Sequence, residues 1–156
     1  MMKARLKKTA FVAATIFVLI QFVQPARNES GQVLDTDISK TVSVPESVQS
    51  ILSKSCYDCH SNHTRYPWYT RIQPGGWFMA YHIRNGKEKL NFNEFGSYPK
   101  RRQESKLDAI AKQIEDDAMP LSSYTLMHQN AVLSPSEKEA IIFWANSSRD
   151  SLSSKN

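Results

Sequence analysis

The pentapeptide Cys56-Tyr57-Asp58-Cys59-His60 contains the only two cysteines of this 156-residue chain. Two cysteines separated by two residues project from one side of a helical turn, and a histidine follows immediately. This pattern is typical of the sequence to which c-type haem is attached. Both sulfurs can form thioethers with the vinyl groups of one porphyrin, and the imidazole of His60 can then ligate the iron. The motif therefore predicts one covalently attached haem.

Two other uses of the cysteine pair compete with haem attachment. A zinc site needs four ligands, typically with a second Cys/His pair at short spacing, and the remaining histidines (His63, His82 and His128) do not form such a pair. A redox-active C-x-x-C usually follows a strand, whereas this pair follows a predicted helix. The N-terminal sequence, described below, indicates that the chain is exported, and an exported chain keeps free thiols poorly. The pattern favours haem over both alternatives.

The iron of such a haem needs either a sixth ligand or an open face. Met119 is the strongest candidate, because it ends an amphipathic segment and is followed by Pro120, which places it at an irregular turn. His82 is the second candidate, since it lies among aromatic residues that could line the other haem face. Met79 and Met127 are predicted to be core residues, the more common role of methionine.

The N-terminus carries four cations in its first eight residues, and residues 9–23 are then uncharged. A basic tip before roughly 7–15 apolar residues is typical of a secretory signal, whereas a membrane-spanning helix needs about 20. The small-residue pattern of a cleavage site is poor here. We therefore expect an uncleaved N-terminal membrane helix, with a cleaved signal as the alternative. Either would place the remaining chain at the periplasmic side of the inner membrane, in the second case as a secreted periplasmic protein.

The charge distribution argues against a nucleic-acid partner. Twenty Lys and Arg against 15 Asp and Glu give a net charge of +5, but four of these cations belong to the N-terminal tip. The rest of the chain is nearly neutral, whereas a phosphate-binding surface needs cations clustered on the folded domain. No nucleic acid is expected to bind.

Hydrophobic periodicity predicts four helical segments and no convincing strand. Each segment carries apolar residues three and four positions apart, as on one face of a helix. Pro45 and the capping box Ser134-Pro135-Ser136-Glu137 are typical helix starts, and Gly86 is predicted to end the second segment. The residues predicted to face the core are Val48, Ile51 and Leu52, then Trp77, Ala80 and Tyr81, then Leu107, Ile110, Ala111 and Ile114, and finally Ile141, Trp144 and Ala145.

These segments predict the domain organisation. Residues 1–26 are expected to be the signal or membrane anchor, and residues 27–44 a polar linker with few apolar positions to bury. Residues 45–148 are predicted to form the haem-binding domain, followed by a Ser-rich, disordered tail at residues 149–156. A domain of about 100 residues gains part of its apolar core from a bound group.

Several separated motifs resemble those of the bacterial haem-binding domain family. They are Cys-Tyr-Asp-Cys-His-Ser-Asn-His-Thr-Arg-Tyr-Pro-Trp-Tyr at residues 56–69, the segment 77–92, and Met119-Pro120-Leu121, in that order within residues 45–146. The family comprises small, exported, c-type cytochrome-like proteins, often with an N-terminal hydrophobic anchor. Gly75-Gly76 departs from the family pattern and is expected to loosen the start of the helix that follows.

The resemblance implies an all-α, cytochrome c-like domain around one haem. It implies thioethers at Cys56 and Cys59, proximal ligation by His60 and distal ligation by Met119. A haem with His/Met ligation suits one-electron transfer with redox partner proteins, and no constellation of catalytic side chains is apparent, so we do not expect an enzyme. The alternative is a haem-dependent, peroxidase-like enzyme or a gas or redox sensor that uses the same haem with an open iron position.

Overall fold

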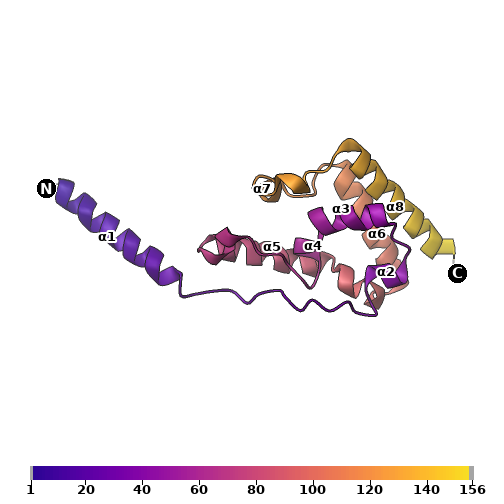
Figure 1. Cartoon of the computed structure of the whole chain (residues 1–156), viewed down its shortest axis with the longest axis horizontal. Coiled ribbons are helices and arrows are strands. Elements are labelled where there is room, and N and C mark those ends of the chain that lie inside the picture. Colours follow the sequence, from indigo (N-terminus) through magenta and orange to yellow (C-terminus); the bar gives the residue numbers. More distant parts are fainter. Residues whose placement is uncertain (1, 155–156) are drawn as a thin grey trace.

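The computed structural model describes residues 2–154, which fold into helices joined by loops (Figure 1). In the described part of the chain, strand-like pairing is limited to one isolated bridge between Glu29 and His63. The predicted all-α class is confirmed. The elements in chain order are α1 (Met2–Ile20), α2 (Ile38–Thr41), α3 (Glu46–Ser55), α4 (Tyr57–His60), η1 (Trp68–Arg71), α5 (Gly75–Lys89), η2 (Phe92–Ser97), α6 (Lys100–Glu115), α7 (Ser122–Thr125), η3 (Gln129–Ala131) and α8 (Pro135–Ser154).

The main core lies where α3, α6 and α8 meet. Leu52 of α3, Leu107 of α6 and Ala145 of α8 are fully buried there, together with Phe92 and Phe95 of η2. Burying side chains as large as Leu or Phe stabilises the fold by about 1.5–3 kcal/mol each. The helix faces predicted for α3, α6 and α8 are therefore confirmed as core-facing.

The predicted capping box begins α8. Ser134 Oγ accepts a hydrogen bond from the Glu137 amide at 3.3 Å, and Glu137 Oε2 accepts one from the Ser134 amide at 2.9 Å. Glu137 Oε1 also accepts a 2.6 Å hydrogen bond from Lys54 Nζ of α3. These contacts fix the start of α8 against α3, because the exposed amides of the first turn find acceptors within the chain.

The predicted disordered tail is wrong as far as Ser154, where α8 ends. Leu152 is buried in the main core, and Arg149 Nη1 donates a 2.6 Å hydrogen bond to Asp108 of α6. These two contacts explain why the helix continues through a Ser-rich sequence. Residues 155–156 of that prediction lie outside the described residues.

The segment 27–44, predicted as a linker, lies along the domain instead (Figure 1). Asn28 Nδ2 donates hydrogen bonds to the Ser61 carbonyl at 2.8 Å and to Thr64 Oγ1 at 3.0 Å. Ile38 of α2 and Val42, which follows α2 and donates its amide to the Ile38 carbonyl at 2.9 Å, belong to the main core. The expectation of few buried positions is therefore corrected.

The second predicted helix has a different buried face from the one expected. α5 continues through Gly86 to Lys89, and its buried residues are Gly76, Met79, Ile83 and Gly86. Trp77 and Tyr81, which were expected to face the core, are exposed. The two buried glycines explain the difference, because they let neighbouring backbone approach the helix at distances that exclude a side chain.

Helix α1 extends away from the domain and buries none of its residues (Figure 1). Among residues 2–154, no helix has the length and apolar character needed to cross a membrane, so the expected N-terminal membrane helix is not found. α1 ends at Ile20, and its uncharged part, residues 9–20, is about 18 Å long at 1.5 Å per residue. A bilayer hydrocarbon core is about 30 Å thick.

Candidate functional site

The pentapeptide forms the sharp junction between α3 and α4. Cys56 lies between the two helices and caps the end of α3 and the start of α4, and its amide donates to the Leu52 carbonyl at 2.9 Å. The Cys56 carbonyl in turn accepts hydrogen bonds from the amides of Cys59 at 3.2 Å and His60 at 3.0 Å. One turn of backbone therefore holds both sulfurs and the imidazole together. The two thiols are not joined by a disulfide.

The imidazole of His60 is held in one orientation and one tautomer. Its Nδ1 lies 3.0 Å from the Leu90 carbonyl oxygen. Because a carbonyl only accepts hydrogen bonds, Nδ1 carries the proton and Nε2 presents a free lone pair. Burial lowers the pKa of His60 below its ordinary value, which favours the neutral ring that binds metal ions. The side chain is thus prepared to act as a metal ligand through Nε2.

A cavity of about 330 Å³ brings together three of the four predicted site residues, Cys56, His60 and Met119. Cys59 is not part of its wall. Most of the remaining wall is apolar, as in pockets that bind flat organic groups. The apolar residues of the wall include Leu52, Leu90, Phe92, Ile110, Ile114 and Ile141.

The polar groups of the cavity also suit a haem. Ser55 Oγ is buried and has no hydrogen-bond partner in the described structure, and Ser55 lines the cavity. Lys89 and Lys106 are the two charged side chains of the wall. A haem carries two propionate groups, so an apolar wall with two cations fits its chemistry. Sequence analysis missed both lysines, because nothing in their local sequence places them beside the pentapeptide.

The thiols lack the properties of a redox-active pair. Burial raises the pKa of Cys56 to about 12 and that of Cys59 to about 11. A redox-active C-x-x-C has a lowered pKa, because the thiolate is the reactive species. This difference disfavours the thiol-exchange interpretation of the motif.

Met119 reaches the cavity through a reversal of the chain after α6. The amides of Ala118 and Met119 both donate to the Gln113 carbonyl, at 3.0 and 3.1 Å. Asp117 takes the left-handed conformation that this reversal needs, with φ of 53°. Met119 then packs against Ile114 and its neighbours at the end of the core. The predicted irregular turn at Met119 is present, and it directs the residue toward the wall that His60 shares.

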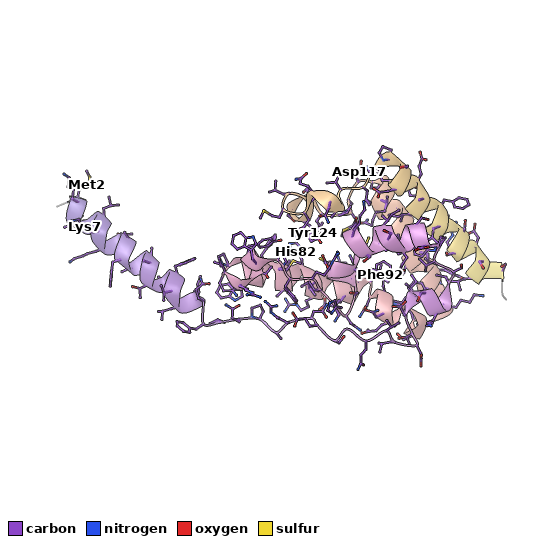
Figure 2. The ribbon with its side chains drawn as sticks, viewed as in Figure 1. Met2, Lys7, His82, Phe92, Asp117 and Tyr124 are labelled. Carbon is purple, nitrogen blue, oxygen red and sulfur yellow. The ribbon has the colours of Figure 1, made fainter. Side chains whose placement is uncertain are left out.

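His82, the second candidate for the distal ligand, does not line this cavity. Its ring packs against Phe78 of α5 at a centroid distance of 4.4 Å, and its buried Nε2 has no partner in the part of the chain that the structure describes. Figure 2 shows His82 on the α7 side of α5, apart from Phe92, which belongs to the cavity wall. The geometry therefore favours Met119 over His82.

Asp58, between the two cysteines, is a structural residue that sequence analysis missed. The residue is only 5% exposed. Oδ1 accepts hydrogen bonds from the amide and from Nε of Arg65, both at 3.1 Å. Oδ2 accepts one from Tyr124 Oη of α7 at 2.6 Å. One buried carboxylate thus connects the pentapeptide to the segment that follows Met119.

Two further side chains extend this contact. Tyr124 stacks on His128 with ring centroids 4.2 Å apart, and His128 Nε2 lies 2.7 Å from Tyr69 Oη. Burial and the hydrogen bond to Asp58 raise the pKa of Tyr124, so its hydroxyl stays protonated and donates. The loop after Met119 is therefore held to η1 as well as to α4.

Replacing Gly86 with alanine should separate α4 from α5. A Cβ at this position would lie 2.5 Å from the Cys59 carbonyl oxygen and 3.2 Å from Cys59 Cβ. Overpacking of this kind costs about 1–3 kcal/mol, which exceeds the gain of up to about 1 kcal/mol that alanine brings to a helix interior. We expect a lower melting temperature and reduced haem content. Glu88→Ala, at an exposed position on the same helix, is the control and should change neither; equal behaviour of the two variants would contradict the close crossing.

Comparison with known protein families relates the chain to haem-binding proteins. A family model described as a haem-binding domain matches residues 15–147, a range that includes the pentapeptide, Met119 and all residues of the cavity wall. No curated protein and no solved structure matches the chain significantly.

Proposed function

We propose that this chain, which belongs to the haem-binding domain family, holds one haem c through thioethers at Cys56 and Cys59 and transfers single electrons. One observation carries the proposal: Cys56, His60 and Met119 line the same apolar cavity, although Met119 is distant from the pentapeptide in sequence. When bound, haem supplies a one-electron Fe(II)/Fe(III) couple. The proposal does not make the protein a catalyst.

In this proposal, His60, Met119 and the apolar wall of the cavity each have a distinct role. His60 binds the iron through Nε2 and is kept in position by the Leu90 carbonyl. Met119 supplies a thioether sulfur, which favours the reduced iron relative to a second imidazole. The apolar wall would limit the access of water to the bound group, and with His60 and Met119 both as ligands the iron would need no substrate to transfer an electron.

In this proposal, residues 1–26 determine the localisation of the protein. A basic tip followed by an uncharged segment is typical of an exported chain, so the domain lies at the periplasmic side of the inner membrane and residues 1–26 contact that membrane. Its partners are redox proteins of the same compartment. Attachment near the membrane raises its concentration close to respiratory partners.

Replacing Met119 with alanine tests the proposed ligation. The ferric protein should show a band at about 695 nm, which is typical of methionine ligation in haem proteins of the His/Met class. Met119→Ala should remove this band while the haem stays attached, and His82→Ala should leave it unchanged. A wild-type protein that lacks the band, binds cyanide readily and turns over peroxide would contradict the carrier proposal and point to an enzyme or sensor.

Lys89 and Lys106 should influence the reduction potential. A cation beside the haem disfavours the additional positive charge of ferric iron, so replacing either lysine with glutamine should lower the potential. We expect a shift of some tens of millivolts, at most about the 59 mV that corresponds to a tenfold change for one electron. Spectroelectrochemical titration measures it. Lys112→Gln, on the same helix as Lys106 but not part of the cavity wall, should leave the potential unchanged; equal shifts in all three variants would contradict the assignment.

A further inference from the structure

The end of the domain nearest α1 carries a group of exposed aromatic side chains. They are Trp68 of η1 and Trp77, Phe78 and Tyr81 of α5, and we call this group the aromatic end. Trp68 is the most exposed of the four, at 73%. η1 packs against α5, and the start of α5 points toward the C-terminal end of α1 (Figure 1). The fold does not cover this apolar surface.

The residues that follow α1 are fixed to the aromatic end by a set of amide hydrogen bonds. Gln21 Oε1 accepts from the Gln73 amide at 2.8 Å, and Gln21 Nε2 donates to the Gln73 carbonyl at 3.2 Å. Gln73 Nε2 donates to Gln24 Oε1 at 2.8 Å, and Trp77 Nε1 donates to the Val23 carbonyl at 2.8 Å. Gln73 itself is fully buried. The chain leaving α1 is therefore part of the folded domain.

The glycine pair at the start of α5 is required by this arrangement. A Cβ on Gly76 would lie 2.5 Å from the Thr70 carbonyl oxygen and 2.7 Å from Gln73 Nε2. The absence of a side chain at Gly76 therefore leaves room for the buried side chain of Gln73. The expectation that Gly75-Gly76 loosens the helix is corrected, because α5 begins at Gly75 and is held there by Gln73.

The charge around the aromatic end is positive. Arg27 and Arg71 line one hollow together with Gly76 of α5, and no acidic residue belongs to its lining. Exposed Trp and Tyr side chains are enriched where a protein meets the headgroup layer of a bilayer, and nearby Lys and Arg are attracted to anionic lipids. The same end of the domain continues directly into the uncharged residues of α1. A lipid surface matches all three properties.

We propose that the aromatic end lies against the surface of an anionic bilayer. This inference rests on the proposed membrane localisation of residues 1–26 and adds a second contact, made by the domain itself. The hydrogen bonds of Gln21 and Gln24 leave no flexible segment between α1 and the domain, so the domain has one orientation on the membrane. Lys89 and Leu90 of the cavity wall lie at the far end of α5, about 20 Å from the bilayer along a 15-residue helix. The cavity is thereby turned toward partners in the periplasm.

Spin-label accessibility on the full-length, haem-loaded protein tests this orientation. The protein is reconstituted in vesicles of phosphatidylethanolamine and phosphatidylglycerol, and a nitroxide is attached to single added cysteines in Trp68→Cys, Phe11→Cys and Phe143→Cys. Phe11 reports on α1, and Phe143, 76% exposed on α8, is the control for an exposed aromatic residue away from the membrane. The parent chain without an added cysteine should take up no label, because its two sulfurs are thioethers.

The expected result is that labels at positions 68 and 11 are more accessible to oxygen, which concentrates in lipid, than to a water-soluble nickel chelate. The label at 143 should show the opposite preference. A lipid-exposed label at 11 with a water-exposed label at 68 would overturn this inference alone. Water exposure at both positions would overturn the proposed membrane localisation and this inference with it. A label at 68 shielded from both reagents would overturn the lipid contact in favour of a protein partner.

Discussion

A chain in which Cys56 and Cys59 are both replaced with alanine should contain no covalently attached haem. These are the only cysteines of the chain, so no other sulfur can form a thioether with the porphyrin. The protein would be produced in a host competent for cytochrome c maturation and denatured. Wild-type protein should keep its colour after acidic acetone extraction and gain about 616 Da from the haem-attachment motif, whereas the double variant should show neither property.

Single variants make this test more specific. Cys56→Ala and Cys59→Ala should each retain one thioether and therefore some covalent haem. Tyr57→Phe, within the same pentapeptide, removes a hydroxyl that contacts Gln49 at 3.0 Å and should leave attachment intact. Complete extraction of colour from the wild-type protein would contradict covalent attachment, while the family assignment would still account for a haem held without covalent bonds.

Local signals in the sequence were sufficient for much of the fold. The Ser134 to Glu137 capping box forms as expected, because all its partners lie within four residues. The stripe on α6 is buried as expected, since a helix of that length displays its periodicity clearly. The pentapeptide and Met119 could be chosen as candidates for a similar reason, because each carries its chemical signal in its immediate neighbours, and Cys56, His60 and Met119 line one cavity.

Features that depend on distant partners could not be predicted. The buried face of α5 is set by the close approach of Cys59 to Gly86, which no periodicity reveals. The packing of residues 27–44 depends on polar contacts with residues 61–64, which lie about thirty residues away in sequence. Asp58 could not be distinguished from a solvent-exposed acid, because Tyr124 is separated from it by 66 residues. In each case the deciding contact is tertiary.

Replacing Asp58 with alanine should cause a large loss of stability. The substitution leaves the Tyr124 hydroxyl and the Arg65 amide without their acceptor beside the pentapeptide. Breaking a fully buried ion pair costs about 3–5 kcal/mol, but the Arg65 side chain is 56% exposed, so we expect about 2–3 kcal/mol. That is a large part of the stability of an ordinary domain, about 5–15 kcal/mol. The midpoint of urea unfolding, followed by circular dichroism, measures the loss.

An exposed ion pair on the same protein provides the matched control. Asp108 pairs with Arg149 at 2.6 Å, and its side chain is mostly exposed, so Asp108→Ala should change the stability by less than about 1 kcal/mol. Asp58→Asn retains an acceptor for Tyr124 and should fall between the two variants. Because Asp58 also holds the loop that follows Met119, Asp58→Ala should weaken the methionine band of the ferric protein, whereas Asp108→Ala should not. Equal stability and equal spectra for Asp58→Ala and Asp108→Ala would show that the buried carboxylate does not connect the pentapeptide to that loop.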